Sequence, residues 1–116
     1  MLLGFGGNIW FYRQPVDFRK QTHGLVVLVA DRLAHNPTSG DLYIFRNRQA
    51  NKIKLLHWDR TGFWLHYKIL ESSRFTFPTT GAEVWKLSKD ELSWLLSGLD
   101  FTKQKQLPQV TATNFF

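Results

Sequence analysis

The stretch from residue 42 to residue 70 constrains the fold most, because three runs rich in β-branched, aromatic and leucine residues follow one another at short spacing. Residues 42–46, 53–58 and 63–70 are typical of strands, and segments 47–51 and 59–62 between them carry turn-forming residues. The short connection 59–62 predicts a β-hairpin in which Gly62 supplies the positive φ of a bulged loop. These residues therefore predict a three-stranded antiparallel meander.

The register of this hairpin decides which side chains share a face, since a one-residue slip exchanges the two faces. If Asp59 faces Phe63, then Trp58 pairs with Trp64, and we expect the apolar set to hold this register. The predicted core face carries Ile53, Leu55, Phe63, Leu65, Tyr67 and Ile69. The opposite face then carries Lys52, Lys54, Trp58, Trp64, His66 and Lys68.

Two further strands and two helices are expected around the meander. Residues 9–12 and 84–87 are typical of short strands. Asp17 is expected to cap a helix that ends near residue 35, before the Asn-Pro pair at 36–37. Ser88 and Glu91 form a capping box for a second helix, which stops at Gly98. The predicted fold is one α+β domain over residues 1–100, an antiparallel β-meander sheet with two packed helices. Residues 1–8 are expected to be a flexible lead-in and residues 101–116 a mobile tail.

The charge balance favours a polyanionic partner. Fifteen Lys and Arg against nine Asp and Glu leave a formal charge of +6 over 116 residues, and most of the surplus lies between residues 41 and 75. The longest apolar run, residues 25–30, is far too short to span a membrane. The chain has no cysteine, which excludes a disulfide framework and fits the reducing cytoplasm where we expect the protein to be.

No arrangement of residues predicts catalysis or metal binding. His57 and His66 are expected on opposite faces of the hairpin, and His23 and His35 lie twelve residues apart, so no pair has metal-ligand spacing. The sequence has no nucleophile elbow and no glycine-rich loop before a phosphate-binding helix. We therefore expect neither an enzyme nor a bound cofactor.

A series of short motifs between residues 9 and 100 resembles one family, the small TnpB-type accessory proteins encoded by insertion sequence 66 and its relatives. The motifs are Asp17-Phe18-Arg19-Lys20, Gly24-Leu25, Pro37, Ser39-Gly40, Phe45-Arg46-Asn47-Arg48, Lys54, Trp58-Asp59, Gly62-Phe63, Tyr67-Lys68, Leu70-Glu71, Arg74-Phe75 and Pro78. Where relatives often have Gly-Phe-Asp after Arg-Lys, this chain has Gln21-Thr22-His23. The resemblance implies a bacterial protein encoded beside a larger transposase that holds the catalytic carboxylates. It implies an accessory role in transposition.

The basic and aromatic strand face predicts a nucleic-acid site, because ammonium groups displace counterions from phosphates and flat rings stack on unpaired bases. Arg48 and Arg60 would extend this face. Arg19 and Lys20 at the start of the first helix would lie beside the positive end of its dipole, where a bound anion would relieve the repulsion. The candidate DNA-binding residues are Arg19, Lys20, Arg46, Arg48, Lys52, Lys54, Trp58, Arg60, Trp64, His66 and Lys68.

Three alternatives stay open from the sequence. Trp58 and Trp64 could pack beneath a helix, with the lysines at the rim of the packed surface. The protein could instead be an adaptor that binds the transposase or a companion accessory protein without contacting DNA. An inert remnant of a decayed element would have the same sequence pattern.

Overall fold

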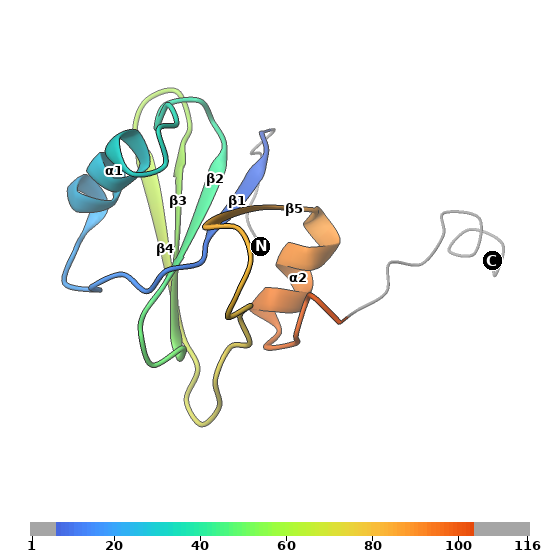
Figure 1. The fold of residues 1–116 in the computed structure, drawn as a ribbon. Helices are drawn as coiled ribbons and strands as arrows, with labels where there is room; N and C mark the ends of the chain where they lie inside the picture. The colour runs from blue at the N-terminus through green and yellow to red at the C-terminus, as the bar shows by residue number, and fades with distance from the viewer. Residues whose placement is uncertain (1–6, 104–116) are drawn as a thin grey trace, which may run out of the picture.

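A five-stranded sheet lies between two helices in the computed structural model, which describes residues 7–103 (Figure 1). The elements in chain order are β1 (Ile9–Tyr12), α1 (Thr22–Asp31), β2 (Leu42–Arg46), β3 (Lys52–Trp58), β4 (Phe63–Ile69), β5 (Val84–Leu87) and α2 (Lys89–Leu96). Most of the expected lead-in and tail lies outside the described residues. Phe101, at the start of the expected tail, is buried and contacts the rings of Phe11 and Trp85.

The sheet is mixed, so the prediction of a purely antiparallel sheet is wrong. Its strand order is β4-β3-β2-β1-β5, and β1 runs parallel to β2 while all other neighbours are antiparallel. The physical reason is the connection between β1 and β2. It passes through α1, and a crossover of this length returns the chain to the same end of the sheet.

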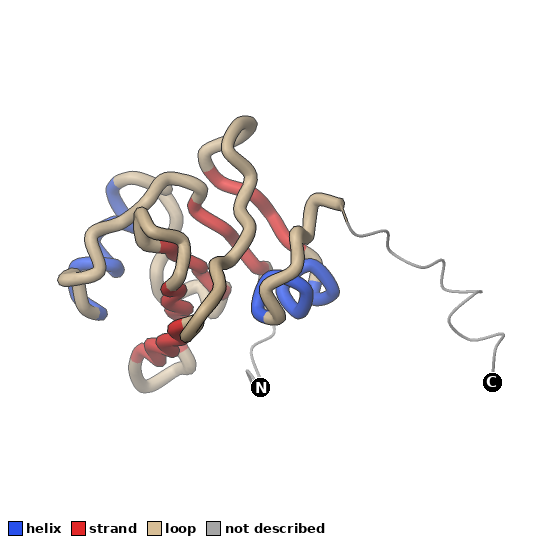
Figure 2. The backbone as a smooth tube through the Cα atoms, turned by 90° about the horizontal axis from the view of Figure 1, so that it is seen from below, coloured by secondary structure: helices blue, strands red, loops and turns tan. Residues whose placement is uncertain are grey.

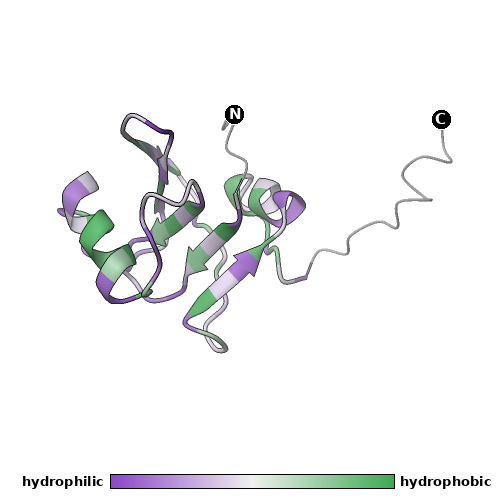
Figure 3. Ribbon diagram, turned by 90° about the horizontal axis from the view of Figure 1, so that it is seen from above, coloured by the Kyte–Doolittle hydropathy of each residue, from purple (hydrophilic) through white to green (hydrophobic). Residues whose placement is uncertain are grey.

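Each face of the sheet is covered by one helix, which gives two cores (Figures 1 and 2). Along β2, Tyr43 and Phe45 belong to the α1-side core, whereas Leu42 and Ile44 belong to the α2-side core. Leu25 of α1 is fully buried on its side. Apolar residues, green in Figure 3, therefore recur along the strands and on both helices. The middle of β3 is buried on both faces.

The β3–β4 hairpin has a register one residue away from the predicted one. Trp58 pairs with Phe63 and His57 pairs with Trp64, so the predicted Trp58–Trp64 pair is wrong. Four residues form the loop, and Arg60 (φ 86°), not Gly62, takes the positive φ. Apolar alternation could not select the register, because β3 buries side chains on both faces.

This register splits the predicted basic face in two. Paired residues in neighbouring strands point to the same face. Lys52, Lys54 and Trp58 therefore lie on the α1 side, and Trp64, His66 and Lys68 lie on the α2 side.

The first helix is shorter than predicted, and Asp17 does not cap it. The helix begins after Gln21, which makes no side-chain cap, and Asp17 instead accepts a hydrogen bond from the backbone N–H of Arg19. The helix ends at Asp31 because Ala34 adopts a left-handed φ of 57°, and the N–H of His35 donates back to the carbonyl of Val29.

The second helix begins as predicted. The Oγ of Ser88 accepts from the N–H of Glu91, and Glu91 accepts in return from the N–H of Ser88. Gly98 follows the helix with a φ of 83°, a left-handed conformation that glycine adopts without strain.

Candidate nucleic-acid interface

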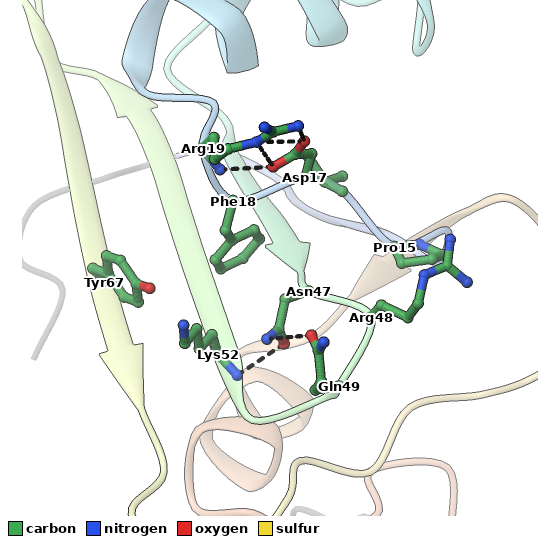
Figure 4. Close-up of a pocket in the computed structure, with 10 residues that line it drawn as sticks. Pro15, Asp17, Phe18, Arg19, Asn47, Arg48, Gln49, Lys52 and Tyr67 are labelled. Atoms are coloured by element: carbon green, nitrogen blue, oxygen red, sulfur yellow. Dashed lines mark hydrogen bonds and ion pairs between the residues drawn. The ribbon is translucent and has the colours of Figure 1, made fainter.

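An open pocket of about 540 Å³ lies where the segment before α1 meets the β2–β3 turn and the edge strand β4 (Figure 4). Three cationic side chains contribute to its wall, together with two aromatic rings and two amides. Its lining residues are Pro15, Val16, Asp17, Phe18, Arg19, Asn47, Arg48, Gln49, Lys52 and Tyr67. We call this site the basic pocket.

The wall formed by the β2–β3 turn is held in shape by Asn47. Its Oδ1 accepts hydrogen bonds from the backbone N–H groups of Asn51 and Lys52, and its Nδ2 donates to the Oδ1 of Asn51 at 2.7 Å. Asn47 is itself buried. These bonds hold Arg48 and Gln49 at the tip of the turn and Lys52 at the start of β3, so the polar wall is anchored to the sheet.

The other polar wall is an ion pair between Asp17 and Arg19. The Nη2 of Arg19 lies 2.6 Å from the Oδ2 of Asp17, and its Nε donates to the same carboxylate. These bonds lower the pKa of Asp17 to about 2 and raise the pKa of Arg19. Among the described residues, Asp17 is the only carboxylate in the lining, and it is engaged by Arg19.

The cations on the turn are not neutralised by protein carboxylates. Within residues 7–103, neither Arg48 nor Lys52 forms an ion pair. Burial, followed by the charges of Arg13 and Arg48, lowers the pKa of Arg46. Arg46 is fixed by a 2.7 Å hydrogen bond from its Nε to the carbonyl of Arg13, and it stacks on Phe77. The end of the sheet near the turn is therefore a region of mutually repelling positive charge, which an anion would stabilise.

Lys54, a predicted DNA-binding residue, is completely buried. Its Nζ donates to the carbonyls of Phe18 and Lys20 at 3.0 and 2.8 Å, and it lies over the rings of Phe18 and Tyr67. Burial and the nearby charge of Lys52 lower its pKa. In this arrangement Lys54 positions the loop beside the pocket and does not offer its charge to a ligand. Lys20 is exposed and does not line the pocket.

The remaining predicted residues lie elsewhere. Lys68, on the α2 side, donates from its Nζ to the carbonyl of Leu96 at 2.7 Å. The indole of Trp64 donates to Asp59, and its ring stacks with His66. Trp58 contacts Phe63 edge-on, its pairing partner across the hairpin. Arg60 lies in the β3–β4 loop, at the opposite end of β3 from Arg48.

Of the eleven predicted residues, the structure brings Arg19, Arg48 and Lys52 into one pocket. Sequence reasoning missed Tyr67, Phe18, Asn47 and Gln49. The sequence predicts Tyr67 on the core face, and only the observed register places it in the pocket wall. The sequence does contain an indication for Asn47 and Gln49 as site residues, because they lie between cations in a predicted turn.

His57 and His66 share a face, contrary to the prediction that they lie on opposite faces. Their Nε2 atoms are 3.3 Å apart and their rings are nearly parallel. Burial lowers the pKa of both imidazoles, and the neighbouring charge of His57 lowers that of His66 further. In the described part of the chain, no group of three or more potential metal ligands of the His, Cys, Asp and Glu types comes together. Neither α1 nor α2 is long and apolar enough to cross a membrane.

Comparison with known proteins assigns this chain, with its mixed-sheet α+β fold, to a protein family. The family model described as IS66 Orf2-like protein matches residues 7–106. The chain belongs to this family of transposition accessory proteins. It is 39% identical to the uncharacterized protein y4jC of Sinorhizobium fredii over 89% of this chain and 88% of that one. It is also 32% identical to the uncharacterized protein y4hO of the same organism, over 81% and 82% of the two chains. No solved structure matches the chain.

Proposed function

We propose that the protein is a non-catalytic accessory factor that binds DNA during transposition, and that the basic pocket is its contact site. The observation that carries this proposal is the composition of the pocket wall. Arg19, Arg48 and Lys52 surround an open cavity in which the one carboxylate among the described lining residues is already paired. Such a wall favours a phosphate, because each cation that meets a phosphate releases condensed counterions.

The rings in the wall extend the proposal from phosphate to nucleotide. The side chain of Tyr67 is about half exposed and lies on the same side of the sheet as Lys52 (Figure 4). Aromatic faces next to a cationic groove bind bases of any sequence by stacking. The pocket therefore supports backbone binding with little sequence preference.

Fluorescence anisotropy against duplex and single-stranded DNA, at several salt concentrations, tests this function. The Arg48→Ala/Lys52→Ala variant should bind on the order of tenfold more weakly per lost contact at about 50 mM salt. Its log–log salt slope should be smaller by about 1.8 for the duplex and by about 1.4 for the single strand. The matched control is Lys86→Ala/Lys89→Ala, which removes the same charge from exposed positions outside the pocket. This control should keep the wild-type slope.

Two outcomes would contradict the proposal. Absence of binding at low salt would exclude DNA binding and leave the adaptor function, with the transposase or a companion accessory protein as the partner to test. An equal loss in the control variant would show that net charge, and not the pocket, drives the interaction.

A further inference from the structure

The outer edge of β4 is an open strand edge. The hydrogen bonds from Leu70 to Asn51 and from Asp59 to Gly62 bracket the β3–β4 ladder. In an antiparallel ladder, hydrogen-bonded pairs alternate with non-bonded pairs. The backbone groups of the even-numbered residues of β4 therefore face β3. Those facing outward belong to Phe63, Leu65, Tyr67 and Ile69. No hydrogen bond from any other part of residues 7–103 reaches these outward groups.

The side chains on this edge are unusually apolar for a surface. Five large apolar side chains are exposed in the described residues, and three of them lie on β4: Trp64 at 54%, Tyr67 at 48% and Ile69 at 51%. The opposite edge strand, β5, has only four residues and carries the exposed Lys86. Short length and an edge lysine protect a strand from pairing. With seven residues, β4 lacks the protection of short length, and three of its exposed side chains are apolar.

We propose that β4 pairs antiparallel with β4 of a second copy of this chain, centred on His66, to join two sheets into one. This register overlaps all seven residues of both strands, because Phe63 then lies opposite Ile69 of the partner subunit. Its hydrogen-bonded pairs fall on the outward-facing odd residues, with Leu65 opposite Tyr67 of the partner subunit. This one pairing gives the outward backbone groups hydrogen-bond partners and brings the apolar side chains of the two strands into contact.

Charge supports the same register. On the α2 side, Trp64 lies opposite Lys68 of the partner subunit, a pair suited to a cation–π contact. Moving the centre to Tyr67 would place Trp64 opposite Leu70 of the partner subunit and remove this pair. Moving it to Lys68 would place two lysines opposite each other, and like charges directly opposite destabilise a sheet. Of these three registers, only the centre on His66 keeps the Trp64–Lys68 pair.

Disulfide trapping tests the pairing directly, because the native chain has no cysteine. In His66→Cys the two introduced residues form a non-hydrogen-bonded pair, whose Cα atoms about 4.5 Å apart are within disulfide range. Oxidation should therefore give a covalent dimer. Trp64→Cys is the matched control, since its two copies lie four residues out of register, about 13 Å apart. It should not cross-link alone but should do so when mixed with Lys68→Cys.

Sedimentation with charge variants covers the case in which the His66 variant folds poorly. Wild-type protein should sediment at twice the 13.6 kDa monomer mass. Trp64→Lys should give the monomer, because the introduced lysine lies opposite Lys68 of the partner subunit at both ends of the paired strands. Trp64→Lys/Lys68→Glu should restore the dimer. A wild-type monomer at hundreds of micromolar overturns the proposal, as does cross-linking of Trp64→Cys alone. A β4 edge that binds a different protein while the chain stays monomeric overturns it too.

Discussion

At the scale of single residues, Lys54 is a cation whose charge is used inside the folded protein and is not available to a ligand. Its stem crosses the α1-side core, and its ammonium group ties two carbonyls of the 18–20 segment to the sheet. A buried ammonium is tolerated only when hydrogen bonds replace water. Lys54 therefore determines where the loop beside the basic pocket lies.

Lys54→Met should lower the free energy of unfolding by about 2 kcal/mol, because the carbonyls of Phe18 and Lys20 lose their donor while the packing volume is kept. Urea denaturation measures the change. The control, Lys52→Met, removes a partly exposed lysine on the same strand and should stay within about 0.5 kcal/mol of wild type. A Lys54→Met variant as stable as wild type would show that burial of the charge offsets its hydrogen bonds.

The His57–His66 pair makes stability depend on pH. Both imidazoles have lowered pKa values in the folded state, and Asp59 opposes this shift at His57. The histidines of the unfolded chain bind protons near pH 6.5, before those of the folded chain do. The stability present above about pH 6.5 is therefore lost as pH falls toward the lowered folded pKa values, by at most about 1.4 kcal/mol per pH unit for each histidine.

Chemical denaturation between about pH 7.5 and 5 should show this loss. His66→Gln should flatten the profile, and His23→Gln, at an exposed position on α1, should leave it unchanged. A flat wild-type profile would contradict the proposed cause.

At the scale of elements, local chemistry sets the ends of α2. The reciprocal bonds between Ser88 and Glu91 satisfy two backbone N–H groups that the helix cannot. Ser88→Ala should therefore lower the free energy of unfolding by about 1 kcal/mol. Thermal or urea unfolding measures it, and Ser93→Ala on the exposed side of the same helix is the control. Equal stabilities of the two variants would show that the cap contributes little.

The elements themselves were predictable from sequence, because their signals are local. The bounds of β1, β2 and β5 match the predicted ranges, and β3 and β4 differ from theirs by one residue. The hairpin register was not predictable. It depends on whether the loop has three or four residues, and Arg60 in a left-handed conformation gave no local signal. Since a helix covers each face of β3, either register buries apolar side chains.

At the scale of the whole molecule, the site is assembled from segments far apart in sequence. Charge alone is enough to predict Arg19, Arg48 and Lys52 as site residues. It does not show that Lys54 is buried or that the side chain of Lys68 is bound to α2. Tyr67 could not be predicted as a site residue, because the β3–β4 register decides which face of the sheet its side chain lies on. Composition thus predicted how much positive charge the surface holds, and only the fold showed where it gathers.

The position of β1 has a consequence for synthesis. Among the described strands this one is synthesised first, yet it lies inside the sheet, where Ile9 faces Leu42 on one side and Leu87 on the other. Pairing over such a sequence separation is slow, because loop closure precedes the contacts that stabilise it. During translation, the edge of β1 that pairs with β5 therefore stays unpaired until β5 has been synthesised. A stop codon between β4 and β5 therefore removes more than its missing residues: it leaves a permanent, aggregation-prone edge at β1.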